Sequence, residues 1–181
     1  MFLKRVLVLS FLFILTSKAI NAQIEVVQAK VKDFKAIGFG SFLNFSIPAS
    51  DANFVTIEGG IQYFKNDDDE ELGLFPVLLG FRYTLNQSGA GFYVEPNAGY
   101  TFGGSTIGVY ENDSPLSDGN GNWLEEKVAG PTAGLGIGYL FEPGGRVQFN
   151  LGLRYQHTFG NAAVNTLSFR ISHAFSFGRR E

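Results

Sequence analysis

The stretch Arg146–Phe177 alternates between large apolar residues and residues that are polar or small. Its first half sets Val147, Phe149, Leu151, Leu153, Tyr155, His157 and Phe159 against Gln148, Asn150, Gly152, Arg154, Gln156 and Thr158. Its second half sets Leu167, Phe169, Ile171, Phe175 and Phe177 against Thr166, Ser168, Arg170, Ser172 and Ser176. A period of two is typical of β-strands, because successive side chains point to opposite faces of the strand. The stretch therefore predicts two strands, each with one apolar and one polar face.

The same period recurs along most of the chain. It predicts six further strands, at Gln23–Val31, Ala36–Ile47, Phe54–Lys65, Leu74–Leu85, Gly91–Phe102 and Trp123–Phe141. The first is weak, with Val27, Ala29 and Val31 on one face, and the fifth is open to extension as far as Tyr110. The connections are mostly of hairpin length, so we expect consecutive antiparallel strands in one sheet, with no internal domain boundary.

The polar faces of these strands differ from a protein surface in water, where Lys and Glu are common. Between Asp67 and Glu126 the chain has no Lys, and the polar faces hold mainly Gly, Ser, Thr, Asn and Gln. Small uncharged residues suit the inside of a narrow barrel, and the opposite apolar faces suit hydrocarbon. The pattern is typical of a transmembrane β-barrel, which must close because an open sheet edge would leave backbone groups unpaired in lipid. A soluble β-sandwich or lipocalin-like barrel, with the apolar face as its core, is the alternative.

The turns between the strands predict strand number and orientation. If the last strand ends in the periplasm, Pro48–Asp51, Asn86–Ala90 and Glu142–Gly145 are periplasmic, and Asn66–Leu72, Glu111–Asn122 and Gly160–Asn165 are external. Long loops on the external side are typical of such barrels. This arrangement requires one more strand before Ala36, and Gln23–Val31 is the candidate. We therefore expect an all-β fold, an eight-stranded antiparallel up-and-down barrel whose interior is just wide enough for side chains to fill.

The N-terminus has the features of a secretory signal peptide. Lys4 and Arg5 precede the apolar run Val6–Thr16, and Ala19–Ala22 is a suitable cleavage site. The run is shorter than the roughly 20 apolar residues that a membrane-spanning helix needs. We therefore expect residues 1–22 to be removed and residues 23–181 to form the barrel domain.

The net charge restricts the binding partners of the chain, and its cysteine content restricts the source of its stability. The signal segment carries three basic residues, Lys4, Arg5 and Lys18, so its removal changes the formal net charge from −3 to −6. A net negative chain is a poor partner for nucleic acid. The chain has no cysteine, so its stability must come from a core or from a bilayer rather than from disulfides.

Five charged residues lie on the inward, polar parity of different strands: Glu58, Arg82, Glu95, Arg154 and Arg170. An isolated charge in a narrow interior is costly, so these side chains should pair with one another. The sequence predicts an internal salt-bridge network that joins some of the two carboxylates and three guanidiniums. Such a network would act as a structural plug that fixes the packing and blocks flow, or else as a gate on a narrow conduction path.

The signal, the alternation and strands such as GLRYQHTF and LSFRISHAFSF resemble the small eight-stranded outer-membrane barrels, the OmpA/OmpX/OmpW-like superfamily of Gram-negative bacteria. The resemblance covers Gln23 to Phe177. It implies a bacterial outer-membrane location, contact with outer-membrane lipids, insertion by the barrel-assembly machinery and a monomeric state. Members typically end on an aromatic residue that this machinery reads, whereas here Gly178–Glu181 follow Phe177.

Catalytic and metal-binding patterns are weak. The resemblance includes lipid A deacylases with catalytic His and Ser two positions apart on the outward face, but Phe159 stands two positions after His157. Asp118–Asn122 resembles the start of a calcium loop, yet Trp123 replaces its glycine and Ala129 its glutamate. We expect no catalytic residue, no metal site and no cofactor.

Three functions follow from these expectations. The first is a non-enzymatic outer-membrane barrel with a side-chain-filled interior, structural or interacting through its external loops. The second is a small pore or carrier for hydrophobic or small polar solutes. The third is a lipid-modifying enzyme, which no Ser-His-Asp arrangement supports.

Overall fold

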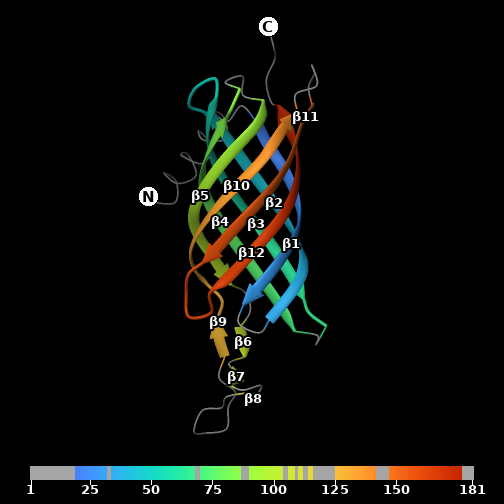
Figure 1. Ribbon diagram of the computed structural model, residues 1–181, viewed down its shortest axis with the longest axis vertical. Helices are drawn as coiled ribbons and strands as arrows, with labels where there is room; N and C mark the ends of the chain where they lie inside the picture. The colour runs from blue at the N-terminus through green and yellow to red at the C-terminus, as the bar shows by residue number, and fades with distance from the viewer. Residues whose placement is uncertain are drawn as a thin grey trace, which may run out of the picture.

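A computed structural model describes residues 19–31, 34–67, 70–86, 90–103, 106–108, 110–111, 114–115, 125–141 and 147–176. Eight long strands form a closed antiparallel barrel (Figure 1). They are β1 (Ala19–Val31), β2 (Phe34–Pro48), β3 (Asn53–Lys65), β4 (Glu71–Thr84), β5 (Gly91–Gly103), β10 (Gly130–Phe141), β11 (Val147–Thr158) and β12 (Val164–Ser176). Neighbours in the chain pair with each other, and β1 pairs with β12 to close the wall. The predicted fold class and strand number are confirmed.

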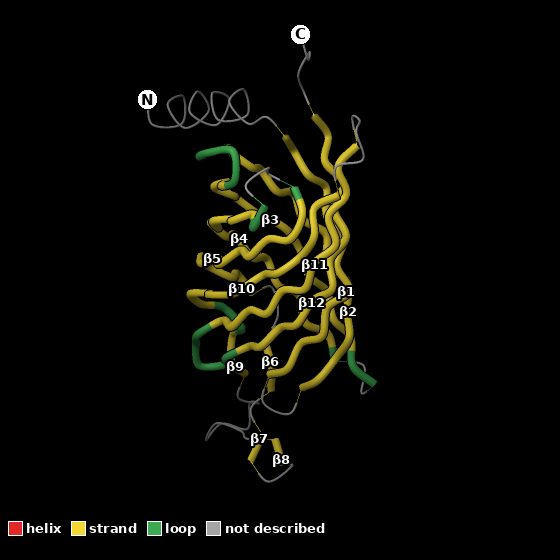
Figure 2. The backbone as a smooth tube through the Cα atoms, turned by 45° about the horizontal axis from the view of Figure 1, so that its top comes forward, coloured by secondary structure: helices red, strands yellow, loops and turns green. Residues whose placement is uncertain are grey.

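Two small sheets interrupt the connection between β5 and β10. β6 (Thr106–Gly108) pairs with β9 (Glu125–Lys127), and β7 (Tyr110–Glu111) pairs with β8 (Ser114–Pro115). They extend beyond one end of the barrel (Figure 2), which the loop pattern assigns to the external side. We call this end the external end.

The predicted extension of the fifth strand to Tyr110 and the predicted start of the next strand at Trp123 were wrong. β5 leaves the wall after Gly103, whose partner Leu74 lies near the start of β4. β10 pairs with β11 from Thr132, opposite Thr158, and with β5 from Gly130, opposite Thr101. Among the described residues of the connection, β6 pairs with β9 and β7 pairs with β8, outside the wall. β2 begins at Phe34, two positions before the predicted start at Ala36.

The first strand begins earlier than the strand predicted at Gln23–Val31. β1 begins at Ala19, four positions before Gln23, and positions 19–22 pair with both β2 and β12. Residues 1–18, which hold most of the predicted signal peptide, lie outside the described residues.

The outward face of the barrel is apolar on all eight strands, and it alternates with a buried inward face. Along β2, for example, Ile37 and Phe39 are 68% and 69% exposed, whereas Phe42 and Asn44 are buried. Large contiguous apolar patches are rare on soluble monomers, so hydrocarbon is the fitting surrounding for this surface. Within the described residues, no helix is long and apolar enough to cross a membrane.

The interior is less polar than the sequence analysis expected. At the external end, eleven buried apolar residues pack together inside the barrel: Val27, Ala29, Val31, Phe34, Ala36, Phe64, Leu72, Leu74, Val128, Ala162 and Val164. We call this cluster the apolar layer. The expectation of small, uncharged inward residues was wrong here, because strand ends such as Val27–Val31 turn apolar side chains inward. In a barrel of eight strands these side chains are close enough to bury one another.

Candidate functional site

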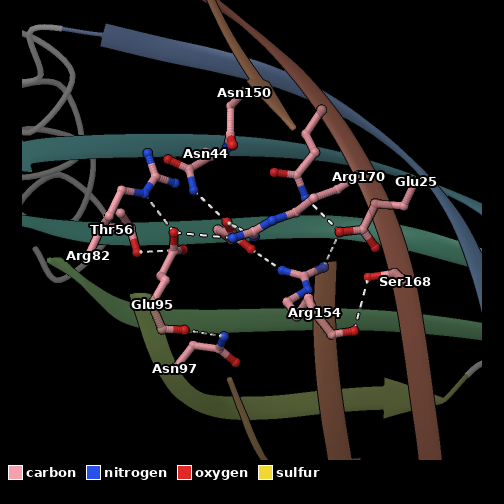
Figure 3. Close-up of polar contacts among 12 residues, drawn as sticks. Glu25, Asn44, Thr56, Arg82, Glu95, Asn97, Asn150, Arg154, Ser168 and Arg170 are labelled. Atoms are coloured by element: carbon pink, nitrogen blue, oxygen red, sulfur yellow. Dashed lines mark hydrogen bonds and ion pairs between the residues drawn. The ribbon is translucent and has the colours of Figure 1, made fainter. Parts of the chain in front are cut away.

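Six charged side chains meet inside the barrel, each from a different strand. Figure 3 shows Glu25, Arg82, Glu95, Arg154 and Arg170 directed toward one another. The six side chains form an alternating series that runs Glu25 (β1), Arg154 (β11), Glu58 (β3), Arg170 (β12), Glu95 (β5) and Arg82 (β4). All six are at most 5% exposed. We call this series the charge network. Three carboxylates face three guanidiniums, so the network is formally neutral.

The two inner guanidiniums each bridge two carboxylates. Arg154 Nη2 lies 2.5 Å from Glu25 Oε1, and Arg154 Nη1 pairs with Glu58 Oε2. Arg170 Nη1 lies 3.4 Å from Glu58 Oε1, and Arg170 Nη2 lies 3.3 Å from Glu95 Oε2. Arg82 Nε ends the series 2.7 Å from Glu95 Oε2. Every carboxylate therefore has at least one cationic partner.

Neutral polar side chains donate further hydrogen bonds to the carboxylate oxygens. Gln23 Nε2 donates to Glu25 Oε1 at 2.6 Å, and Gln62 Nε2 donates to Glu25 Oε2 at 3.3 Å. Asn44 Nδ2 donates to Glu58 Oε1 at 2.5 Å. Thr56 Oγ1 donates to Glu95 Oε1 at 3.3 Å. Hydrogen bonds of this kind offset the cost of removing a carboxylate from water.

Aromatic rings and glycines fix where the guanidiniums lie. Arg82 stacks over the ring of Tyr93, with 4.8 Å from its guanidinium carbon to the ring centroid, and Arg154 lies 4.7 Å above Phe42. Arg170 occupies space that glycines leave open on β10 and β11. A Cβ at Gly136 would lie 2.8 Å from Arg170 Nη2, and a Cβ at Gly152 would lie 3.0 Å from Arg170 Nε. The glycine-rich inward face of β10 therefore makes room for the network.

All five sequence-predicted residues are brought together in this network, and a sixth, Glu25, joins them. The sequence analysis missed Glu25 because the strand that carries it was weak and its inward face was not assigned. Its parity could have identified it: Glu25 shares a face with Val27, and the exposed Ile24 and Val26 lie on the other. With Glu25, the network joins three carboxylates and three guanidiniums instead of the two and three that were predicted.

Each carboxylate of the network is held by at least one guanidinium. The described residues contain no group of three or more His, Cys, Asp or Glu that could hold a metal ion. Asp118–Asn122, which resemble the start of a calcium loop, lie outside the described residues.

Comparisons with known proteins relate the chain through structure only. No family model and no curated protein matches the sequence. Neisserial surface protein A matches with a TM-score of 0.63 at 12% identity, over 88% of this chain and 96% of that one. Ail, the attachment invasion locus protein of Yersinia pestis, matches with 0.56 at 13%, over 87% and 97%. The N-terminal β-barrel domain of Pseudomonas aeruginosa OprF matches with 0.52 at 11%, over 88% and 98%.

The chain has the fold of the small eight-stranded outer-membrane β-barrels. At identities of 11–13% the likeness concerns the fold and not the activity. The bacterial outer membrane is the location that this fold and the apolar outward surface both indicate.

His157 lies on the outward face of this outer-membrane barrel, near the external end, as its parity predicted. Its Nδ1 lies 2.8 Å from Asn165 Oδ1, which also accepts a hydrogen bond from the Tyr155 hydroxyl at 2.6 Å. Its ring meets the Phe159 ring edge to face, with centroids 4.4 Å apart. The position that would hold a nucleophile two residues on is therefore an aromatic packing partner.

Proposed function

We propose that this chain is a monomeric, non-enzymatic outer-membrane barrel that does not conduct solutes and that acts through its outer surface and external end. The observation that carries the proposal is that two successive levels of the interior are filled. The charge network occupies one level, and the apolar layer closes the lumen nearer the external end. A passage would have to cross both.

The apolar layer is the more effective barrier of the two. Its members Phe64 and Leu72 are fully buried, so a water file would have to pass between closely packed apolar side chains. Hydrophobic constrictions block ions by excluding water. Breaking ion pairs in the charge network would therefore leave the barrel closed.

Two features support a role without catalysis. The charge network uses its carboxylates and guanidiniums on one another, which leaves no acid or base directed at a substrate. His157 is held by Asn165 and packs on Phe159 instead of on a hydroxyl. The structural likeness to Neisserial surface protein A adds support for an outward-directed role.

Two further expectations complete the proposal. The closed wall has no free strand edge for a second copy to pair with, which supports a monomer. The apolar outward face would contact outer-membrane lipids directly. Insertion by the barrel-assembly machinery would precede this contact, and depletion of that machinery is expected to remove the folded band from the outer-membrane fraction.

Conductance in planar bilayers tests the closed interior. The full chain is inserted, and insertion is verified by recovering a faster-migrating band on unboiled SDS gels. The unsubstituted chain is expected to give no current steps, and neither is the network double variant Glu25→Gln/Arg154→Met. Phe64→Ser, which places a hydroxyl and a void in the apolar layer alone, is also expected to give no steps, because the charge network still fills the lumen. The triple variant Glu25→Gln/Phe64→Ser/Arg154→Met alters both levels and is the variant expected to leak. Regular current steps from the unsubstituted chain would overturn the proposal in favour of a small pore.

A further inference from the structure

A row of polar side chains crosses four neighbouring strands on the outward face, close to the external end. Lys35 on β2 is the cross-strand partner of Lys30 on β1, Lys30 is also the partner of Asn165 on β12, and Asn165 is the partner of His157 on β11. Figure 2 shows these four strands side by side. Because neighbouring strands lie about 4.8 Å apart, the row spans roughly 14 Å. We call it the polar row.

The polar row stands at the edge of the apolar surface. One step toward the middle of the barrel, the outward residues are Ile37, Gln28, Leu167 and Tyr155. One further step on, they are Phe39, Val26, Phe169 and Leu153. The surface thus passes from wholly apolar to mixed to cationic within two rows. Lys side chains near such a boundary extend their amines toward the headgroups, so the row lies at headgroup level in the external leaflet.

The two lysines of the row face each other directly across the β1–β2 strand pair. Both Lys30 and Lys35 are exposed, and like charges placed directly opposite each other across a strand pair are destabilising. In the part of the chain that the structure describes, neither lysine forms an ion pair. Lys65 differs, because its cross-strand partner on β4 is Glu71. An anion bound from outside would relieve the repulsion between the two ammonium groups of the Lys30–Lys35 pair.

The other half of the row supplies oriented hydrogen-bonding groups. Asn165 Oδ1 accepts from the Tyr155 hydroxyl at 2.6 Å and lies 2.8 Å from His157 Nδ1. Because one oxygen takes both contacts, the amide side chain is fixed in place and its Nδ2 can donate elsewhere. His157 is steadied by its edge-to-face contact with Phe159. The row thus combines two ammonium groups with a held amide donor.

We propose that the polar row binds the phosphate group of a lipid in the external leaflet. Lys30 and Lys35 are the charge partners of the phosphate oxygens, and the Asn165 amide donates a hydrogen bond to them. The acyl chains of the same lipid lie along the apolar rows beneath, against residues such as Val26 and Phe169. Lysine binds phosphate as a point charge, and both charges lie on one side of the barrel. This site is independent of the closed interior proposed above.

Binding of a phosphorylated glycolipid tests the site. The full chain is refolded in neutral detergent and titrated with lipid A, which carries phosphates, and with the same glycolipid after removal of its phosphates. Lys30→Gln is compared with Lys65→Gln, which removes a cation one step from the row but opposite a carboxylate. Since each surface lysine contributes about 1 kcal/mol to binding an anionic lipid, Lys30→Gln should weaken binding about 5-fold and Lys30→Gln/Lys35→Gln about 30-fold. Lys65→Gln should change it less than about 2-fold.

Further measurements distinguish a lipid phosphate from a free phosphate ion and show whether each variant is folded. The charge-conserving double variant Lys30→Arg/Lys35→Arg should keep binding, and all variants should show the folded band on unboiled gels. Equal affinity for the dephosphorylated glycolipid would overturn the proposal, as would full binding by the double Gln variant. Complete displacement of lipid A by inorganic phosphate at equal concentration would show a free-anion site instead, and would also overturn it.

Discussion

We expect substitutions at Glu25 and Arg154 to have coupled effects on the free energy of unfolding, because the two side chains belong to one charge network. Arg154 is 1% exposed and pairs with both Glu25 and Glu58. Arg154→Met removes both pairs while it roughly keeps the length of the side chain. Glu58 keeps Arg170 and Asn44, but Glu25 keeps only the amide donors Gln23 and Gln62.

Removing one partner of a buried pair costs about 3–5 kcal/mol, because the other charge is left uncompensated. Arg154→Met should therefore lower the folding equilibrium constant by roughly two to four powers of ten. The second substitution, Glu25→Gln, removes the charge that was left unpaired. Two carboxylates, Glu58 and Glu95, then face two guanidiniums, Arg82 and Arg170. We expect Glu25→Gln/Arg154→Met to be at least about 2 kcal/mol more stable than Arg154→Met alone, within the coupling that such neighbours show.

Urea unfolding of the refolded chain measures these differences. The folded fraction is read from the faster unboiled band on SDS gels, and the free energy is extrapolated to zero urea. Arg154→Lys serves as the control, because it keeps the charge count but loses the two-pronged geometry, and it should cost less than Arg154→Met. If the double variant is less stable than Arg154→Met, with the two costs simply adding, the six side chains do not act as one charge-balanced unit.

Two further predictions concern the space around the network and the membrane boundary. Gly136→Ala should destabilise by about 1–3 kcal/mol, because its Cβ would crowd Arg170, whereas Gly59→Ala, with nothing within 4 Å of its Cβ, should be close to neutral in the same urea titration. Leu153→Arg, in the apolar belt, should cost about 2–4 kcal/mol in bilayer vesicles, and His157→Arg, on the same face at the external edge, about 0–1 kcal/mol. Equal costs at the last two positions would contradict the assigned membrane boundary.

Local alternation was enough to predict most of the barrel wall. Outward residues such as Phe39 and Leu153 and inward residues such as Glu95 and Arg154 could be separated by parity alone, because the side-chain period of a strand is two regardless of its neighbours. The turns fixed the strand count in the same way, since antiparallel neighbours need only short connections. These features depend on contacts between residues close in sequence.

Parity was insufficient where both faces of a segment are apolar. Leu72 and Leu74 point inward, while Phe75 and Val77, a few residues on, point to lipid. Hydrophobicity cannot distinguish a lumen-facing leucine from a lipid-facing one, so the apolar layer could not be read from the chain. The burial of these residues depends on side chains contributed by other strands.

By itself, the sequence determined that this chain forms alternating antiparallel strands, and that five named charges share the inward parity. Only the tertiary structure decided which charges meet. Glu25 and Arg154 are 129 positions apart, and their contact requires β1 to close on β12 in one particular register. That register sets the position of every inward side chain along the barrel axis. It also places the outward side chains of Lys35, Lys30, Asn165 and His157 in one row across neighbouring strands. Parity is a property of each strand, whereas height in the barrel is a property of the closed wall.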